Sequence, residues 1–313
     1  MKRFVSIFTA LTTAAAVMPL TVSAEDSTAP SETSPPGPIY HYEVTDSAAK
    51  TARITGSENI SGNVTLPAEI AGCKVTAIAD RAFLGNCDIT TVTVPDTVEE
   101  IGSFAFSGCL NLTDVKLPAG VKKLGNSCFL SCTSLVEADL GDSLTAIPER
   151  CFYSCSSLLW ADIPETVELI GKEAYYSCPD VSGIRIPPSV KTIGADAVGV
   201  HYDIKTSSAK NISGFCITGS AGSYAQLYSA DKGFSFREDH GHMLGDADLD
   251  GMVLAFDASA TLREYTILSS GKRPTLSRLQ RENADYDKDG RLSAFDASSI
   301  LRAYTIASSK VEH

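Results

Sequence analysis

The chain of 313 residues has an ordinary globular composition, 43% hydrophobic and 20% charged, and its length corresponds to about two domains. Its net charge of -12 at pH 7 argues against nucleic acid and against an anionic membrane surface as partners, because both favour clustered lysine and arginine. The composition also excludes disorder outside short segments.

The N-terminus has the pattern of a secretory signal peptide. Lys2 and Arg3 precede an apolar run over residues 4–20, and the small residues VSA over 22–24 form a cleavage site. We therefore predict a signal peptide over residues 1–24 and an exported, extracellular protein. No later segment approaches the length that spans a bilayer, so membrane insertion is not expected. Residues 25–38, rich in Pro, Ser and Thr, are predicted to form an extended linker.

Short strands are predicted from residue 39, and they lead into a regular repeat. From Val75 to Val198 the sequence repeats every 23 residues. Apolar residues recur in columns, for example Ile78, Ile101, Leu124, Ile147, Ile170 and Ile193, and Phe83, Phe106, Phe129, Phe152, Tyr175 and Val198. One unit of this length cannot bury its apolar face alone, so the period predicts a solenoid whose coils stack into one continuous core.

Each coil contains a segment of the form L-x-x-V-x-L-P, which predicts a short strand, followed by I-G-x-x-A-F-x-x-C, which turns the chain back. The sequence IGSFAFSGC over residues 101–109 is typical. These motifs resemble the BspA-type leucine-rich repeat of bacterial surface proteins, over about residues 40–236. The resemblance implies a β-rich leucine-rich-repeat solenoid and indicates little about its ligand.

After Val198 the period ends, and a strand, a short helix around residues 223–230 and a closing strand are predicted to cover the last coil. The capped solenoid is therefore expected over residues 39–236. Residues 237–244 are predicted to be a short polar linker to a second domain.

The cysteines fall at repeated core positions. All nine lie between Cys73 and Cys216, and one column comprises Cys109, Cys132, Cys155 and Cys178. We predict buried thiols, because Cys packs as a small hydrophobic residue and a file of four offers no unique pairing. A disulfide between coils about 4.8 Å apart is not excluded by geometry, and a zinc site is less favoured because no His accompanies the column.

The side chains that flank the inward column of each strand must point outward, because neighbours along a strand alternate faces. The candidate ligand-binding residues on this face are Asp114, Glu137, Trp160, Asp139 and Asp162. The only tryptophan is predicted to be exposed among carboxylates, as an anchor for a ligand or as part of a solvated face. A glycosidase pair of Glu137 and Asp162 is disfavoured, because a regular sheet face lacks the concave site that raises one carboxyl pKa.

The C-terminal part contains a duplicated acidic loop. The loop that begins at Asp246 recurs 39 residues later at Asp285, with Asp at loop positions 1, 3, 5 and 12 and Gly at position 6. This spacing suits a hard dication that binds six to eight oxygens, with a backbone carbonyl from position 7. We predict two Ca²⁺ ions, with ligands from Asp246, Asp248, Asp250, Met252 and Asp257, and from Asp285, Asp287, Asp289, Arg291 and Asp296.

The second loop has Ser293 at position 9, where the first loop has Leu254. Serine offers an oxygen at this position and leucine does not. The first site is therefore predicted to hold its ion through water or more weakly.

Both loops run into near-identical helical sequences, AFDASATLREYTI and AFDASSILRAYTI. Together these units resemble a type I-like dockerin over about residues 245–310, the module that attaches cellulosome components of anaerobic bacteria to cohesin domains of a scaffoldin. The resemblance implies a small all-α, EF-hand-like domain over residues 245–313. It assigns the cohesin contacts to Ala255, Phe256, Ser259, Leu262, Arg263 and Ile267, and to Ala294, Phe295, Ser298, Leu301, Arg302 and Ile306.

The duplication implies, by resemblance to dockerins, that either half can face the cohesin. A second core face is the alternative for the phenylalanine stripe. The opposite stripe of each helix, Ala258, Thr261 and Tyr265 in the first and Ala297, Ile300 and Tyr304 in the second, is expected to pack the two halves together.

These predictions describe a secreted, non-catalytic, cellulosome-associated protein. Its dockerin binds a cohesin when calcium is present, and its solenoid binds an unknown protein or carbohydrate, as in adhesion. The alternatives for the solenoid are an unrecognised enzyme or inhibitor activity, or a role as a structural spacer.

Overall fold

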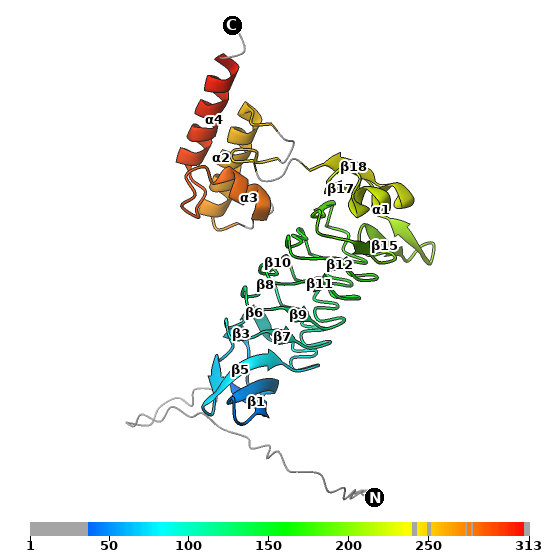
Figure 1. Cartoon of the computed structure of the whole chain (residues 1–313), viewed down its shortest axis with the longest axis vertical. Coiled ribbons are helices and arrows are strands. Elements are labelled where there is room, and N and C mark those ends of the chain that lie inside the picture. The colour runs from blue at the N-terminus through cyan, green and yellow to red at the C-terminus, as the bar shows by residue number, and fades with distance from the viewer. Residues whose placement is uncertain (1–36, 240–242, 249–251, 273, 277, 310–313) are drawn as a thin grey trace, which may run out of the picture.

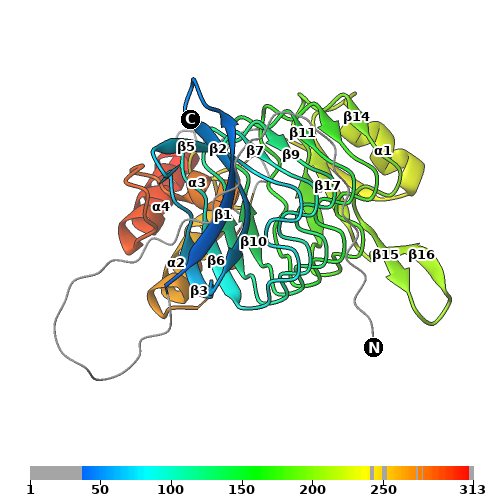
Figure 2. The same ribbon diagram turned by 90° about the horizontal axis from the view of Figure 1, so that it is seen from below.

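Parallel coils stack along the long axis of the molecule and are followed by a group of helices (Figure 1). This computed structural model describes residues 37–239, 243–248, 252–272, 274–276 and 278–309. The predicted signal peptide, most of the linker after it and the predicted ligand Asp250 lie outside the described residues. Viewed along the stack, the coils superpose, and the C-terminal helices lie beside the sheet that contains β6 and β10 (Figure 2).

The N-terminal strands cover the first coil, as predicted for a cap. The strands β1 and β2 form an antiparallel hairpin, and β2 continues as a parallel neighbour of β5, which also pairs with β4. These elements are β1 (Ile39–Asp46), β2 (Thr51–Glu58), β3 (Gly62–Thr65), β4 (Glu69–Ile70) and β5 (Cys73–Ile78).

Two rows of parallel strands run along the solenoid. The first row contains β7 (Glu100–Ile101), β9 (Lys123–Leu124), β11 (Ala146–Ile147), β12 (Leu169–Ile170) and β14 (Thr192–Ile193). The second row contains β6 (Ile89–Thr93), β8 (Asp114–Lys116), β10 (Glu137–Asp139), β13 (Gly183–Arg185), β17 (Cys216–Gly219) and β18 (Ser235–Glu238). Val92, Val115 and Ala138 are direct partners across adjacent strands, so the 23-residue period sets the strand register.

Each row is divided once. The first row divides between β9 and β11, at the coil where Pro148 replaces the repeated glycine. In neighbouring coils that glycine donates its amide to the coil before it, as Gly125 does to the Ile101 carbonyl at 2.7 Å. Proline has no amide hydrogen and cannot make this bond. The second row divides between β10 and β13, where residues 160–162 form no strand.

The core follows the predicted columns. The rings of Phe83, Phe106, Phe129, Phe152 and Tyr175 form one continuous stack, with centroids 5.0–5.5 Å apart and interplanar angles of 5–12°. The inward column of the second row is also buried, as predicted: Val92, Val115, Ala138, Ala161 and Ile184. The prediction of a leucine-rich-repeat solenoid is therefore confirmed.

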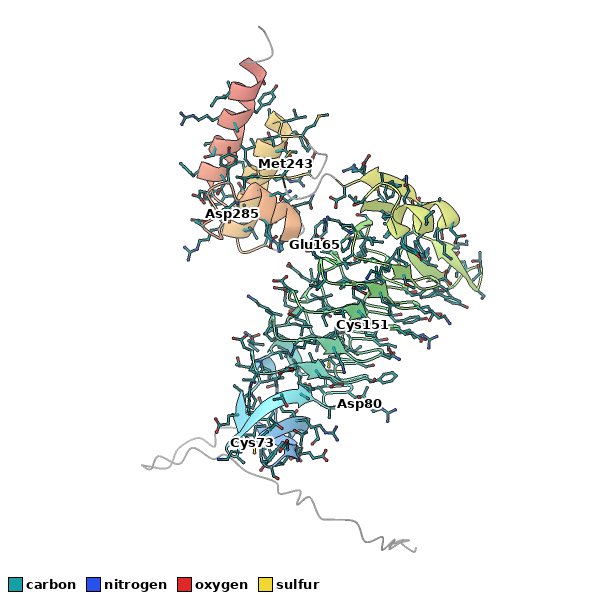
Figure 3. The ribbon with its side chains drawn as sticks, in the orientation of Figure 1. Cys73, Asp80, Cys151, Glu165, Met243 and Asp285 are labelled. Carbon is teal, nitrogen blue, oxygen red and sulfur yellow. The ribbon has the colours of Figure 1, made fainter. Side chains whose placement is uncertain are left out.

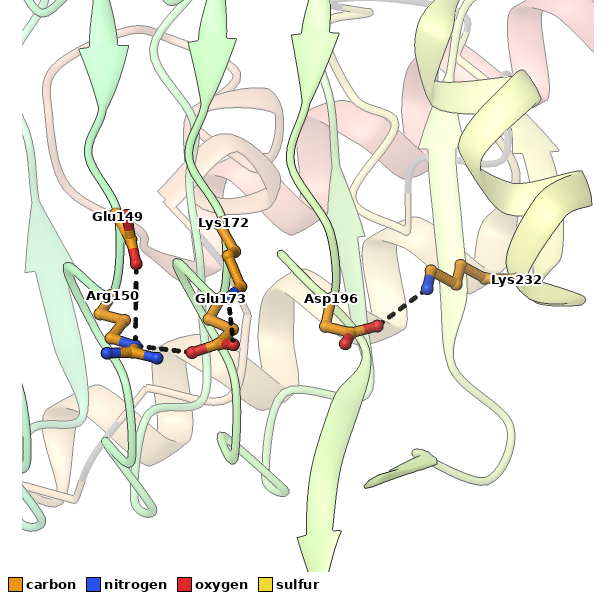
Figure 4. A network of polar contacts seen from close by, with 6 residues as sticks. All are labelled: Glu149, Arg150, Lys172, Glu173, Asp196 and Lys232. Carbon is orange, nitrogen blue, oxygen red and sulfur yellow. Dashed lines mark hydrogen bonds and ion pairs between the residues drawn. The ribbon is translucent and has the colours of Figure 1, made fainter. Parts of the chain in front are cut away.

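The turns repeat with the same period and carry a row of charges. Arg150, Glu173 and Asp196 occupy equivalent positions, with positive φ of 56°, 55° and 52°. Arg150 Nε donates to Glu173 Oε2 at 2.6 Å, and Lys232 of the capping helix α1 (Tyr224–Lys232) donates to Asp196 at 2.8 Å (Figure 4). Exposed pairs of this kind contribute at most about 1 kcal/mol each. The first pair joins two adjacent coils, and the second joins the cap to the last coil.

The C-terminal cap is the predicted strand, helix and strand, formed by β17, α1 and β18. A hairpin of β15 (Val200–Asp203) and β16 (Ser208–Asn211), which the sequence did not predict, precedes it. The strand β18 runs two residues past the predicted end of the solenoid at residue 236. Arg185 holds the chain just beyond it, because its Nε donates to Asp239 Oδ2 at 2.8 Å.

Three helices complete the described chain: α2 (Ala255–Ser269), α3 (Arg278–Ala284) and α4 (Ala294–Ser309). The helices α2 and α4 pack against each other, and Ala258, Thr261, Ala297 and Ile300 are buried as predicted. Tyr265 differs from the prediction because it is 36% exposed. The sequence analysis did not predict α3. Within the described chain, every helix is too short or too polar to cross a bilayer.

Candidate functional site

The second acidic loop brings three predicted ligands together. One carboxylate oxygen from each of Asp285, Asp287 and Asp289 lies within 4.8 Å of the other two. The backbone holds them there, because Gly290 N donates to Asp285 Oδ2 and Arg291 N to Asp289 Oδ1, both at 2.8 Å. Desolvation, followed by repulsion from the neighbouring carboxylates, raises the pKa of Asp287. The cluster therefore favours a cation.

The first loop forms a similar group from Asp246, Asp248 and Asp257, whose oxygens also lie within 4.8 Å of one another. Asp246 and Asp257 are each only 1% exposed. These two carboxylates therefore lie where water has little access. Met252, predicted to offer its backbone carbonyl from position 7 of this loop, is 60% exposed.

The aspartates at position 12 close both loops through the backbone. Asp257 Oδ1 accepts the Ala247 amide at 2.8 Å, and Oδ2 accepts the Leu254 amide at 2.7 Å. Asp296 makes the equivalent bonds from Tyr286 at 2.9 Å and from Ser293 at 2.8 Å. Each carboxylate lies in the first turn of the next helix, where the helix dipole also favours negative charge. Each aspartate therefore connects its loop to the first turn of the next helix.

The donor set of both loops fits calcium, which binds carboxylate and carbonyl oxygens in a flexible geometry. Asp246, Asp248 and Asp257 would hold one ion, and Asp285, Asp287 and Asp289 the other. Both groups contain positions 1 and 3 of the loop. The third member is Asp257 at position 12 in the first loop and Asp289 at position 5 in the second.

Two buried polar residues hold neighbouring segments of the C-terminal module together, and the sequence analysis missed them. Asn283, 3% exposed, accepts the Gly245 amide on its backbone carbonyl at 2.7 Å and donates Nδ2 to the Asp246 carbonyl at 3.1 Å. Glu264 is fully buried and accepts the Thr275 hydroxyl at 2.6 Å. A comparison of the two copies could have indicated Glu264, because the two helical sequences are nearly identical but the second copy has Ala303 at the equivalent position.

The helices that follow the loops expose equivalent apolar residues. Phe256 is 65% and Phe295 63% exposed, and Leu262 and Leu301 are 47% and 46% exposed. Arg263 and Arg302 are exposed beside them. Neither phenylalanine packs in a core of the described chain. This exposure argues against the alternative interpretation of the phenylalanine stripe as a second core face.

The remaining predicted contact residues follow the same two faces. Ser259 and Ser298 each donate to the carbonyl four residues earlier in their helix, that of Ala255 and that of Ala294. Ile306 is 48% exposed, whereas Ile267 is half-buried.

The outward face of the solenoid is less open than predicted. Asp114 is exposed, but Glu137, Asp139, Trp160 and Asp162 are only partly exposed. The prediction of an exposed Trp160 is wrong: its indole Nε1 is buried and has no hydrogen-bond partner within the described part of the chain. The physical reason is that residues of the C-terminal module, including Asp248 and Gln280, line the same cavity as Trp160.

All nine cysteines are free thiols in the structure. Six are buried: Cys109, Cys128, Cys132, Cys151, Cys155 and Cys178. Each thiol of the main column donates to a backbone carbonyl 26 residues earlier, in the preceding coil, as Cys132 Sγ does to Phe106 O at 3.1 Å. Burial raises the pKa of Cys109 and of Cys178 to about 12.

We therefore expect the native protein to react slowly with a thiol reagent at the six buried positions. Cys87, which is exposed, should react first, and the half-buried Cys73 and Cys216 more slowly. The measurement is colorimetric titration of thiols at pH 8, before and after denaturation. Rapid reaction of a cysteine in the 109–178 column, identified by peptide mapping, would contradict a packed thiol core.

Comparison with known proteins identifies part of the chain. The family described as "BspA type Leucine rich repeat region" matches residues 76–203 in 6 copies. This confirms the predicted resemblance over these residues. No curated protein matches the chain.

Solved structures of leucine-rich repeat proteins are also similar to this chain. One from T. pallidum is 28% identical with a TM-score of 0.45, and the match covers 50% of this chain and 78% of the other. A leucine-rich cell surface protein from Faecalibacterium prausnitzii is 25% identical with a TM-score of 0.43. That match covers 61% of this chain, and the chain spans 62% of the length of that protein.

Proposed function

Because residues 76–203 form a BspA-type leucine-rich repeat region, we propose that this chain is a secreted, non-catalytic binding protein with two binding parts. The solenoid offers an extended surface for a protein or carbohydrate ligand, a common use of such folds. The C-terminal module acts as a calcium-dependent dockerin that binds a cohesin of a scaffoldin. The observation that carries the second proposal is the pair of exposed phenylalanines, each next to an acidic loop.

Calcium would affect cohesin binding by ordering the segment at which each helix begins. When bound, the ion neutralises the clustered carboxylates and holds the loop in one conformation. Asp257 and Asp296 then bond both the loop and the amides before α2 and α4. Phe256 and Phe295 each directly precede these aspartates, so an ordered loop fixes the position of both phenylalanine side chains.

Each helix face has the composition of a small protein-binding surface. Phe256 with Leu262, and Phe295 with Leu301, provide apolar centres, and Arg263 and Arg302 provide charge at the rim. Binding energy concentrates in a few aromatic and arginine residues at such surfaces. The near-identity of the two faces supports the proposal that either half can face the partner.

The test truncates the exposed Phe and Arg side chains of the two helix faces, first separately and then together. We expect Phe256→Ala with Arg263→Ala, and Phe295→Ala with Arg302→Ala, each to leave binding to immobilised cohesins largely intact in calcium. All four changes together should weaken binding by about 100-fold or more, because both anchoring pairs are lost. Binding is measured by surface plasmon resonance, with circular dichroism to confirm the helices.

A matched control is Leu227→Ala, which removes an apolar side chain that is 63% exposed on the solenoid cap. It should leave cohesin binding unchanged. Loss of binding from one pair alone contradicts the two-orientation proposal. If folded protein in calcium binds no cohesin of a representative panel, the dockerin proposal is wrong.

A further inference from the structure

The helix α3 contacts the outward face of the solenoid through an arginine. Arg281 Nη2 donates to Glu137 Oε1 of β10 at 2.6 Å. Its Nη1 donates to the Leu276 carbonyl at 2.6 Å, which orients the guanidinium from within its own module. The two side chains of the pair are only 22% and 24% exposed. This geometry gives a directed, partly desolvated ion pair between residues 144 positions apart in the chain.

Cavities beside this contact are lined by both parts of the chain. Glu282 of α3 lines one together with Glu137, Asp162 and Glu165. Gln280 and Asp248 line another together with Trp160. Figure 3 shows Glu165 on the side of the solenoid that faces the C-terminal helices. The contact therefore extends from β10 across residues 160–162, the place where the second row of strands divides.

The chemistry of this face suits an arginine. The first cavity is lined by five solenoid carboxylates, those of Glu137, Asp139, Asp142, Asp162 and Glu165. Its solenoid cation, Arg185, already bonds Glu165 and Asp239. A negative, partly enclosed surface attracts a guanidinium, and Arg281 supplies one.

The chain connection keeps α3 close to this face. Asp239 is bound to Arg185 at the end of the solenoid, and Gly245 is bound to Asn283 in the C-terminal module. Six peptide steps separate residues 239 and 245, and they span at most about 20 Å. A short connection raises the effective concentration of one part at the other, which favours the contact between α3 and the solenoid face.

We propose that the outward face between Glu137 and Arg185 is a docking surface for α3 of the same chain, anchored by Arg281. In the docked arrangement the C-terminal module covers Trp160. The solenoid face predicted to bind an external ligand is thus occupied by the chain itself, and a ligand at this face must displace α3. This inference does not depend on cohesin binding.

The only tryptophan of the chain reports directly on docking. We expect the acrylamide quenching constant of Trp160 fluorescence to rise severalfold in full-length Arg281→Gln and Glu137→Gln variants in excess calcium. The double variant should be no more accessible than either single variant, because each change removes the same contact. Circular dichroism and the unfolding midpoint check that all variants are folded.

Lys272→Gln is the matched control, because Lys272 is an exposed cation of the same module and has no ion pair among the described residues. It should leave the quenching of Trp160 unchanged. Unchanged quenching in folded Arg281→Gln overturns the proposal. Additive increases in the double variant also overturn it, because the two residues then act independently.

Discussion

Phe129→Ala is expected to destabilise the solenoid by about 3–5 kcal/mol, the usual cost of truncating a buried phenylalanine. Phe129 is fully buried, and its ring stacks on Phe106 at 5.5 Å and on Phe152 at 5.4 Å. Truncation in the middle of the stack removes contacts with the coils on both sides. Because each coil of a solenoid is stabilised mainly by its neighbours, the cavity weakens two interfaces at once.

Urea unfolding followed by circular dichroism measures this loss. Phe129→Leu should cost less, because leucine refills part of the space. The control Leu110→Ala removes a side chain that is 44% exposed in the same solenoid, and it should cost less than about 1 kcal/mol. A Phe129→Ala variant as stable as the control would show that the ring stack contributes little to the fold.

Removal of calcium is expected to unfold residues 245–309 and to leave the solenoid folded. Within the described part of this module, the buried apolar side chains are those of Ala247, Ala258, Ala284, Ala297 and Ile300. A core of this size leaves the module dependent on ion binding. At a free calcium concentration 1,000 times the dissociation constant, one ion stabilises the folded state by about 4 kcal/mol. Without it, repulsion between the clustered carboxylates remains.

Hydrogen exchange with mass spectrometry separates the two parts of the chain. In calcium, peptides from α2 and α4 should be protected, and in excess EDTA that protection should be lost. Peptides from residues 76–203 serve as the internal control and should stay protected in both. Asp285→Asn should reproduce part of the loss, whereas Asp114→Asn on the exposed solenoid face should not. Protection of α4 that is unaffected by EDTA would rule out calcium-dependent folding.

Local and periodic features of the fold were predictable. The recurrence of Phe83, Phe106 and Phe129 at 23-residue intervals requires one column in the core, because equivalent residues of stacked coils overlie one another. The duplication around Asp246 and Asp285 likewise predicted a group of carboxylates in each loop and two equivalent exposed phenylalanines. Within one copy, however, the sequence did not reveal that Asp257 and Asp296 bond the backbone of their own loops.

The sequence by itself determined the coil period, the inward and outward alternation of each strand and the duplicated acidic loops, because these depend on neighbours at fixed spacing. The tertiary structure alone decided what surrounds the outward face. Trp160 has the pattern of an exposed residue, yet α3 contacts its neighbourhood through Arg281 and Glu137. These two residues lie 144 positions apart, outside both periods, so only the packing of the two parts brings their charges together.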